Sequence, residues 1–230
     1  MSLASLGILE EAELLQDAFH VIIPMLDGHA GSDRPFTSIG DCASELIRFI
    51  DSDLGGSAAL IGGLSLGGQV LLEMLSRRSG LCRCAFVESA MAIPAGLTHA
   101  LIGPSVRSSA ALVRNRRFAG LQFRSLHIRP DLFEDYYRDT CRIRTPDMVA
   151  FLKASTGYAL KDSIRSCGAR VHLFIGGKEN RGIRRSAELV RSVLPDCALT
   201  VLPGYVHGDF SINHPEDYAR AVRDALGQPG

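Results

Sequence analysis

Short apolar runs alternate along the chain with stretches in which apolar residues recur every three or four positions. Such runs have the length of buried strands, and the other spacing is that of helices facing a core. Strands are predicted over His20–Leu26, Ala58–Leu64, a run that ends with Ala85–Glu88, Arg170–Ile175 and Ala198–Leu202. Helices are predicted over Ile39–Ile50, Leu66–Arg78, Ile183–Leu194 and from Pro215 to just before Gly227. This alternation predicts an α/β fold with a mostly parallel sheet and helices on both faces.

Residues 95–165 depart from this rhythm, because they contain helix-like segments and loops but no convincing strand. We interpret this segment as a helical lid inserted between the third and fourth strands, and call it the insertion. The predicted organisation is therefore one core made of residues 1–94 and 166–230, with the insertion at 95–165.

The composition excludes several classes of protein. With 230 residues, 46% hydrophobic and 22% charged, the chain is not a disordered segment. Its formal net charge of zero argues against a general nucleic-acid binder. No apolar run is long enough to span a membrane, and the first 16 residues, with acids and no basic region, do not form a secretory signal. We therefore expect a cytoplasmic protein with neither nucleic acid nor membrane as partner.

Six cysteines in a chain of this size, without an export signal, are expected to be reduced thiols. The pair Cys82 and Cys84 has only one residue between its members, a spacing that suits neither a zinc site nor a redox pair. We find no cluster of metal-ligating residues in the sequence.

The neutral total hides an uneven distribution of charge. The insertion holds ten Arg and two Lys against six acidic residues, and the stretch Arg107–Arg129 contains no acid. One interpretation is a solvated face, or a basic lid that docks on an acidic core. Another is attraction of an anionic substrate. A nucleic-acid surface is favoured least, because few aromatic residues are interleaved with the arginines.

The pattern G-x-S-x-G lies where the second predicted strand becomes a helix, as Gly63-Leu64-Ser65-Leu66-Gly67. In this context it is typical of a nucleophile elbow, a tight turn that lifts a serine hydroxyl clear of the sheet. We expect side chains at Gly63 and Gly67 to clash with the turn. Ser65 would lie at a helix N-terminus, where the N–H of Leu66 could stabilise an oxyanion. The alternative is a glycine-rich turn between a strand and a helix in which the serine has no catalytic role.

A serine nucleophile needs a base and an acid that orients the base. His207 follows the last strand, at the same carboxyl edge of the sheet as Ser65, whereas five of the other six histidines fit a strand, the insertion or a helix end. Glu179 follows the fourth strand and completes the order serine, acid, histidine. Glu88, at the end of the third strand, is the alternative acid, and Asp209 is too close to His207 in sequence to be the first choice.

Four motifs together resemble the α/β-hydrolase superfamily, especially small bacterial serine hydrolases with a helical lid. They are Pro24-Met25-Leu26-Asp27-Gly28-His29, Gly63-Leu64-Ser65-Leu66-Gly67-Gly68, Gly176-Gly177-Lys178-Glu179 and Pro203-Gly204-Tyr205-Val206-His207-Gly208. The resemblance implies Ser65 as nucleophile, His207 as base and Glu179 as acid, no cofactor, and a structural turn at Asp27 and His29. The insertion matches nothing specific.

The chain departs from the family at its start. Family members usually begin with further strands, and one of these ends in a His-Gly loop that donates the second oxyanion N–H. Here Leu9–Ala18 resembles the helix after that loop, and Ser2–Leu6 leaves room for a stub of strand at most. We therefore expect the N-terminal strands to be missing from the sheet.

The activity that this resemblance implies is hydrolysis of an ester, thioester or related small acyl compound, carboxylesterase-like, through an acyl-enzyme. Two alternatives are a lyase or C–C bond-cleaving enzyme on the same fold, and a non-catalytic binding protein with an incomplete oxyanion hole.

Overall fold

The computed structural model describes residues 3–194 and 196–227. In this part of the chain, four parallel strands form one sheet in the order in which they occur in the sequence. The register aligns Leu64 with Glu88 and Glu88 with Phe174, so the carboxyl ends of three strands lie level at one edge. The strands are β1 (Ala58–Leu64), β2 (Cys82–Glu88), β3 (Arg170–Gly176) and β4 (Ala198–Leu202).

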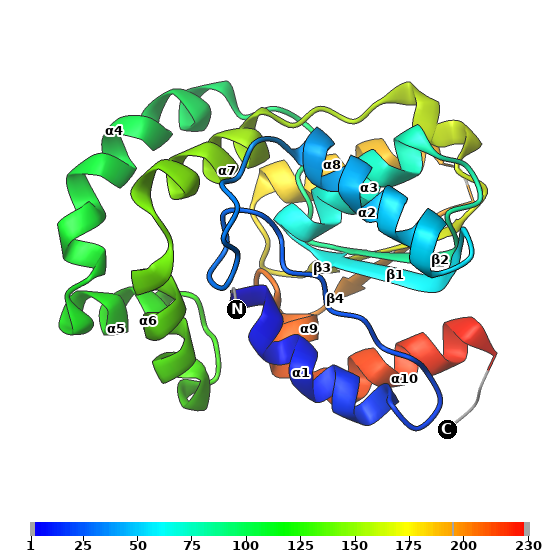
Figure 1. The fold of residues 1–230 in the computed structure, drawn as a ribbon, viewed down its shortest axis with the longest axis horizontal. Helices are drawn as coiled ribbons and strands as arrows, with labels where there is room; N and C mark the ends of the chain where they lie inside the picture. Colours follow the sequence, from blue (N-terminus) through cyan, green and yellow to red (C-terminus); the bar gives the residue numbers. More distant parts are fainter. Residues whose placement is uncertain (1–2, 195, 228–230) are drawn as a thin grey trace.

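Helices cover both faces of the sheet, as the sequence pattern predicts (Figure 1). One face packs on α2 (Ile39–Asp53), α3 (Leu66–Arg77) and α8 (Arg181–Val193), and the other on α1 (Leu3–Leu15) and α10 (Pro215–Leu226). Successive side chains of β2 point to opposite faces of the sheet. Ala85 and Val87 pack in the core beneath α2, α3 and α8, and Phe86 packs in the core beneath α1 and α10. A short helix, α9 (Asp209–Asn213), precedes α10.

Two predicted helix ends are confirmed by their capping contacts. Ser38 is the N-cap of α2, and its hydroxyl accepts a hydrogen bond from the N–H of Asp41 at 3.0 Å. Gly227 ends α10 in the left-handed conformation that helix C-termini favour.

The predicted strand over His20–Leu26 is wrong, because this segment is an extended coil. A strand needs a neighbour to complete its hydrogen-bond ladder. The described backbone gives it none, since β1 is the edge strand and pairs only with β2. Ile22 and Met25 are consequently left exposed. The residues Leu3–Leu6, for which the sequence left room for a stub of strand at most, already lie in α1, and Ser2 lies outside the described residues. The N-terminal strands that family members usually have are missing from the described sheet, as expected.

The insertion contains helices and no strand in the part of the chain that the structure describes. Its α-helices are α4 (Gly96–Val113), α5 (Arg116–Ser125), α6 (Phe133–Arg142) and α7 (Thr145–Gly157). Short 3-10 turns, η1 (Pro130–Leu132) and η2 (Asp162–Ser166), complete it. The helices stand beside the sheet rather than on its faces, and α4 packs along α7 (Figure 1).

The two chain segments that enter and leave the insertion are bonded to each other and to the core. The N–H of Ala95 donates to the carbonyl of Thr156 at 2.8 Å, and the N–H of Leu160 donates to that of Ala92 at 3.0 Å. The buried amide of Gln69, on α3, donates to the carbonyls of Met91 and Ser155, both at 2.9 Å. These bonds join α7 to the core at the stem of the insertion.

Two further observations bear on the sequence predictions. All six cysteines are free thiols, and five of them are buried. Among the described residues, no helix combines the length and the apolar character that crossing a membrane requires.

Candidate active site at the carboxyl edge of the sheet

Ser65 occupies a strained turn between β1 and α3. Its backbone angles are φ 54° and ψ −111°, in the positive-φ range that residues with a side chain rarely adopt. The neighbours hold this conformation, because the N–H of Ser65 donates to the carbonyl of Glu88 at 2.8 Å and its carbonyl accepts from the N–H of Gln69 at 3.0 Å. The turn ends at Leu66, the first residue of α3, whose N–H has no intrahelical acceptor and is available to an oxyanion.

Of the two glycines expected to relieve crowding in this turn, only the first does so. A Cβ on Gly63 would lie 2.5 Å from the carbonyl carbon and oxygen of Gly67, closer than any real contact. A Cβ on Gly67 would meet nothing within 4 Å, so the expectation for this residue is wrong. The tight second position is instead Gly68, where a Cβ would lie 2.9 Å from that of Ala90. The crowding arises because the start of α3 passes directly over the end of β1.

His207 and Glu179 form a hydrogen-bonded pair. The ring Nδ1 of His207 lies 3.1 Å from Oε1 and 3.4 Å from Oε2 of Glu179. The Glu179 side chain is 2% exposed, whereas that of His207 is 48% exposed. Burial by itself would raise the pKa of Glu179, but the hydrogen bond and charge of His207 outweigh it and hold the pKa below its usual value. The pair therefore combines a fixed carboxylate with an accessible imidazole.

Two glycines bring the Glu179 loop against the His207 loop. A Cβ on Gly176 would lie 2.4 Å from the carbonyl oxygen of Tyr205, so only glycine allows the loops to cross here. The crossing is then closed by two backbone hydrogen bonds, from Gly177 to Leu202 at 2.7 Å and from Lys178 to Tyr205 at 2.9 Å. The Gly176-Gly177 motif is thus part of the scaffold that pairs Glu179 with His207.

The His207 loop also reaches the nucleophile elbow. Gly208, in the left-handed region at φ 73°, packs against the side chain of Leu64, and a Cβ there would be 3.1 Å from Leu64 Cδ2. The residues next to His207 and Ser65 are therefore in contact. No hydrogen bond joins the Ser65 hydroxyl to His207 within the described structure, a bond that is often long in enzymes without substrate.

Glu88, the alternative acid, has different partners. Its buried carboxylate accepts hydrogen bonds from the N–H groups of Phe210 at 3.1 Å and of Ser211 at 3.2 Å, at the start of α9. Burial raises its pKa to about 7. Its carboxylate has no hydrogen bond to His207 within the described structure, so the arrangement brings Glu179, and not Glu88, to the imidazole.

A second buried acid, Glu11, was not among the residues that the sequence singles out. It lies on α1 with Oε1 unpartnered, and burial, followed by the nearby charge of Glu88, raises its pKa to about 9. Burial also raises the pKa of Tyr218, with both acids adding to the shift. The sequence signal was misleading here, since Glu11 belongs to a group of acids that looks solvent-exposed.

The insertion packs over the candidate site from one side. Phe123 of α5 and Tyr136 of α6 form a small core with Ile212 of α9, and Leu64 packs against this cluster. Asn213, at the end of α9, accepts a hydrogen bond from the N–H of Arg129 at 3.0 Å and donates to the carbonyl of His127 at 2.8 Å. The insertion thus contacts Leu64, which precedes Ser65, and the helix α9 that follows the His207 loop.

The histidines outside this site have local roles. His29 lies in the turn after Asp27, with Nδ1 3.1 Å from the Asp27 carbonyl, and its ring stacks on Phe151 at 4.9 Å. His172 packs against Phe86, and His214 stacks on Tyr205. Among the described residues, no group of three or more His, Cys, Asp or Glu could hold a metal ion.

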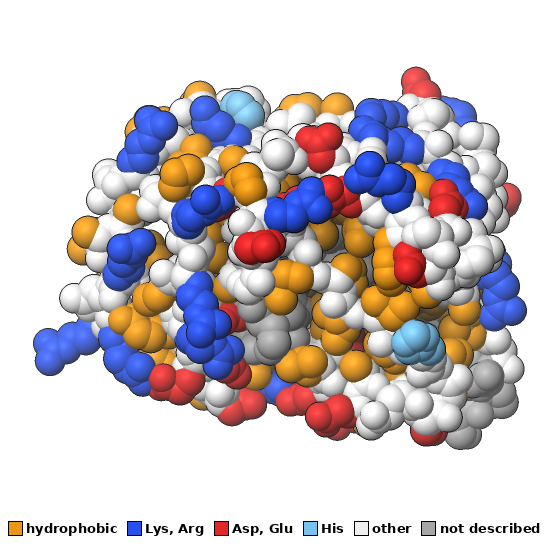
Figure 2. Space-filling view, in the orientation of Figure 1, with side chains coloured by type: hydrophobic (Ala, Val, Ile, Leu, Met, Phe, Trp, Pro, Cys, Tyr) orange, Lys and Arg blue, Asp and Glu red, His pale blue; other side chains and the backbone are white. Residues whose placement is uncertain are grey.

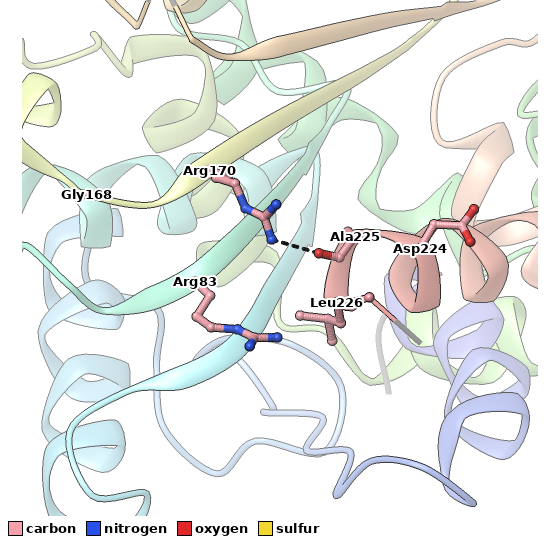
Figure 3. Close-up of a pocket in the computed structure, with 7 residues that line it drawn as sticks. Arg83, Gly168, Arg170, Asp224, Ala225 and Leu226 are labelled. Atoms are coloured by element: carbon pink, nitrogen blue, oxygen red, sulfur yellow. Dashed lines mark hydrogen bonds between the residues drawn. The ribbon is translucent and has the colours of Figure 1, made fainter. Parts of the chain in front are cut away.

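Two cavities lie away from the elbow. The larger, about 480 Å³, is at the opposite, amino-terminal edge of the sheet (Figure 3). Arg83 and Arg170 reach it from the starts of β2 and β3, opposite the last turn of α10 with Asp224 (Figure 3). A hydrogen bond from Arg170 to the Ala225 carbonyl closes part of it. The smaller, about 260 Å³, lies between the His29 turn and residues Arg142, Arg144 and Asp147. Neither is lined by Ser65, His207 or Glu179.

The fold has many counterparts among solved structures. An esterase from Thermogutta terrifontis (malate bound) is 18% identical, with a TM-score of 0.74 over 96% of this chain and 85% of that one. A hydrolase from Pseudomonas aeruginosa PA01 is 17% identical, with a TM-score of 0.75 over 98% of this chain and 87% of that one. An esterase from Exiguobacterium antarcticum is 14% identical, with a TM-score of 0.80 over 97% of this chain and 87% of that one. At these identities the likeness concerns the fold.

The sequence itself matches a known family over most of its length. No curated protein sequence matches the chain significantly. The profile of the alpha/beta hydrolase family, however, matches residues 3–221, and therefore includes the elbow and the segments that carry Glu179 and His207. The chain belongs to the alpha/beta hydrolase family.

Proposed function

We propose that this hydrolase is a serine enzyme that cleaves a small ester, thioester or related acyl substrate through Ser65, His207 and Glu179. The observation that carries the proposal is the bond of 3.1 Å between His207 Nδ1 and the buried Glu179 carboxylate, next to the strained elbow of Ser65. An accessible imidazole oriented by a fixed carboxylate is what a serine nucleophile requires.

In the proposed mechanism, Nε2 of His207 takes the proton of the Ser65 hydroxyl while Oγ attacks the substrate carbonyl carbon. The negative charge that develops on the carbonyl oxygen is stabilised by the N–H of Leu66. His207 then gives its proton to the leaving alcohol or thiol, and an acyl-Ser65 ester remains. Water, deprotonated by His207, hydrolyses that ester and restores the serine. Glu179 stabilises the imidazolium in both halves.

We also propose that the insertion acts as a lid that shapes the acyl-binding side of the site. Its position supports this role, because it lies between β2 and β3 in the chain and packs on Leu64 and Ile212. The names of two similar structures, both esterases, fit an ester substrate. The six free cysteines fit a reducing compartment, and on that basis we place the activity in the cytoplasm.

The experiment that tests the proposal is labelling with a fluorophosphonate, which reacts with an activated serine whatever the natural substrate. We expect the wild-type chain to be labelled and the Ser65→Ala variant to be unlabelled. Ser192→Ala, an exposed serine on α8, is the matched control and should label normally. A folded wild-type chain that never reacts would refute the proposal.

A further inference from the structure

Helix α4 is apolar on its outer face as well as its inner one. Its inner face packs along α7. On the outer side, Leu97, Leu101 and Leu112 are 80%, 55% and 50% exposed. Spacings of four and eleven residues place these three side chains on one face. Exposed Pro104 and Ala111 extend the same stripe. A helix that is apolar all round is normally covered on every side.

No part of the chain that the structure describes packs over this outer face. Figure 2 shows hydrophobic side chains on the left of the molecule, where Figure 1 places α4 and α5, interspersed with Lys and Arg side chains. Exposed Ser108 lies within this stripe. A set of exposed leucines on one helix face, bordered by charge, is typical of an interaction surface.

The segment of the chain that contains this stripe has charged side chains of positive sign only. Residues 96–130 contain six arginines and no acid. Two of the six are neutralised by acids further along or earlier in the chain, since Arg116 pairs with Glu134 and Arg129 with Glu10. The other four form no ion pair or side-chain hydrogen bond in the described structure: Arg107, Arg114, Arg117 and Arg124.

Helix α5 repeats the same combination of residues. Leu121 is 67% exposed, and Arg117 and Arg124 lie four residues before and three residues after it, on the same face. The opposite face of α5 carries the buried residues Ala119 and Phe123. Two successive helices of the insertion therefore present leucines and unpaired arginines to the outside.

We propose that the outer faces of α4 and α5 dock on the surface of an anionic lipid bilayer. Leucines flanked by cations fit this surface, because the apolar side chains can enter the acyl boundary while the guanidinium groups bind the lipid phosphates. The helices would lie in the plane of the interface. No membrane partner was expected from the sequence, because that expectation rested only on membrane-spanning runs and secretory signals.

A second copy of the chain fits the same surface less well. A symmetric dimer would bring identical patches together, and each patch carries the unpaired arginines with no acid to face them. Like charges opposed across an interface weaken association. An anionic bilayer instead neutralises all four arginines at once.

The test is co-sedimentation of the full chain with phosphatidylcholine vesicles, with and without phosphatidylglycerol. We expect sedimentation with the anionic vesicles only, weakened by added salt. The double variant Arg117→Gln/Arg124→Gln should lower the partition coefficient by about 30-fold, at about 1 kcal/mol for each arginine. Leu97→Gln/Leu101→Gln should lower it by at least about tenfold, because two leucines no longer enter the acyl boundary. Both variants change exposed side chains, so the thermal midpoint should stay the same.

The matched control is Arg181→Gln/Arg185→Gln, which removes two exposed arginines without ion pairs from α8 and should leave vesicle binding unchanged. Three results would overturn the proposal: no binding to anionic vesicles, equal binding to neutral ones, or equal losses in the control. A dimer that Leu97→Gln/Leu101→Gln dissociates, with no vesicle binding, would assign the surface to a second copy. Vesicle binding does not depend on Ser65, so its failure and the failure of the hydrolase proposal can be told apart.

Discussion

Replacing Glu179 by Gln tests which acid serves His207. The substitution keeps the size of the side chain but removes the negative charge 3.1 Å from the imidazole. His207 becomes an imidazolium in the proposed mechanism, and its side chain is about half exposed. Two unit charges about 4 Å apart, at the effective dielectric constant of about 20 that suits such a pair, interact by about 4 kcal/mol. Losing that stabilisation lowers kcat by about 10³-fold.

The matched variant is Glu88→Gln. The Glu88 carboxylate bonds to the N–H groups of Phe210 and Ser211 and has no hydrogen bond to the ring. A glutamine oxygen still accepts one of these bonds, and the acid with a pKa of about 7 is already half protonated at neutral pH. We therefore expect a loss of kcat below about tenfold, since the hydrogen bond that is lost is worth about 1 kcal/mol.

The assay combines steady-state hydrolysis of a p-nitrophenyl ester with the rate of fluorophosphonate labelling. The labelling rate reports the nucleophilicity of Ser65 without depending on the substrate. Because the pKa of Glu179 lies below its usual value, its carboxylate is ionised throughout the range from about pH 6 to 8 in which the rates are compared. If Glu179→Gln reacts like the wild type while Glu88→Gln loses about 10³-fold, Glu88 is the acid and the reasoning fails.

Three further predictions concern stability and the shape of the site. Gly63→Ala should lower the free energy of unfolding in urea by about 3 kcal/mol and abolish labelling, because its Cβ overlaps the Gly67 carbonyl. Gly67→Ala places its Cβ in open space and should be neutral or slightly stabilising. A variant at Gly67 that is less stable than the variant at Gly63 would contradict the elbow geometry. Glu11→Gln should change the pH dependence of unfolding. With a folded pKa of about 9, the contribution of Glu11 to stability is fully present below about pH 4.5 and is lost as the pH rises to about 9. An unchanged pH dependence in the variant would show that this acid is not buried. Gly176→Ala should lower both kcat and the free energy of unfolding, because its Cβ would overlap the Tyr205 carbonyl and displace the loop that carries His207, and full activity would argue against that crossing.

The strands of the sheet could be predicted because each is a short apolar run, which is mostly buried in β2 and β3 and only partly buried in the outer strands β1 and β4. The limits of β1 and β4 agree with the prediction, and β3 extends one residue further, to Gly176. The error over His20–Leu26 has a physical origin. Its sequence favours a strand, but a strand also needs a neighbour, and pairing is a tertiary property that the local pattern does not contain.

The candidate triad was predicted from spacing and chain order, and the contact between Glu179 and His207 agrees with that prediction. The environment of the other acids was not predictable. Glu11 lies in an acidic stretch that resembles a solvent-exposed helix, yet it is 5% exposed. The partners of Glu88 are backbone N–H groups of α9, which only the three-dimensional arrangement brings to the end of β2.

The bonds at the stem of the insertion have a consequence for movement. The Gln69 amide and the two backbone hydrogen bonds pin α7 to the core at the point where the chain enters and leaves. An opening motion that swings the whole insertion away from the core would have to break the bond from Gln69 to Ser155 and the bond from Leu160 to Ala92. Displacement of α5 and α6 breaks none of them, so the hinge for substrate entry should lie within the insertion, at the ends of α4 and α7 distant from the stem. Entry would then leave the elbow helix, and the serine at its start, undisturbed.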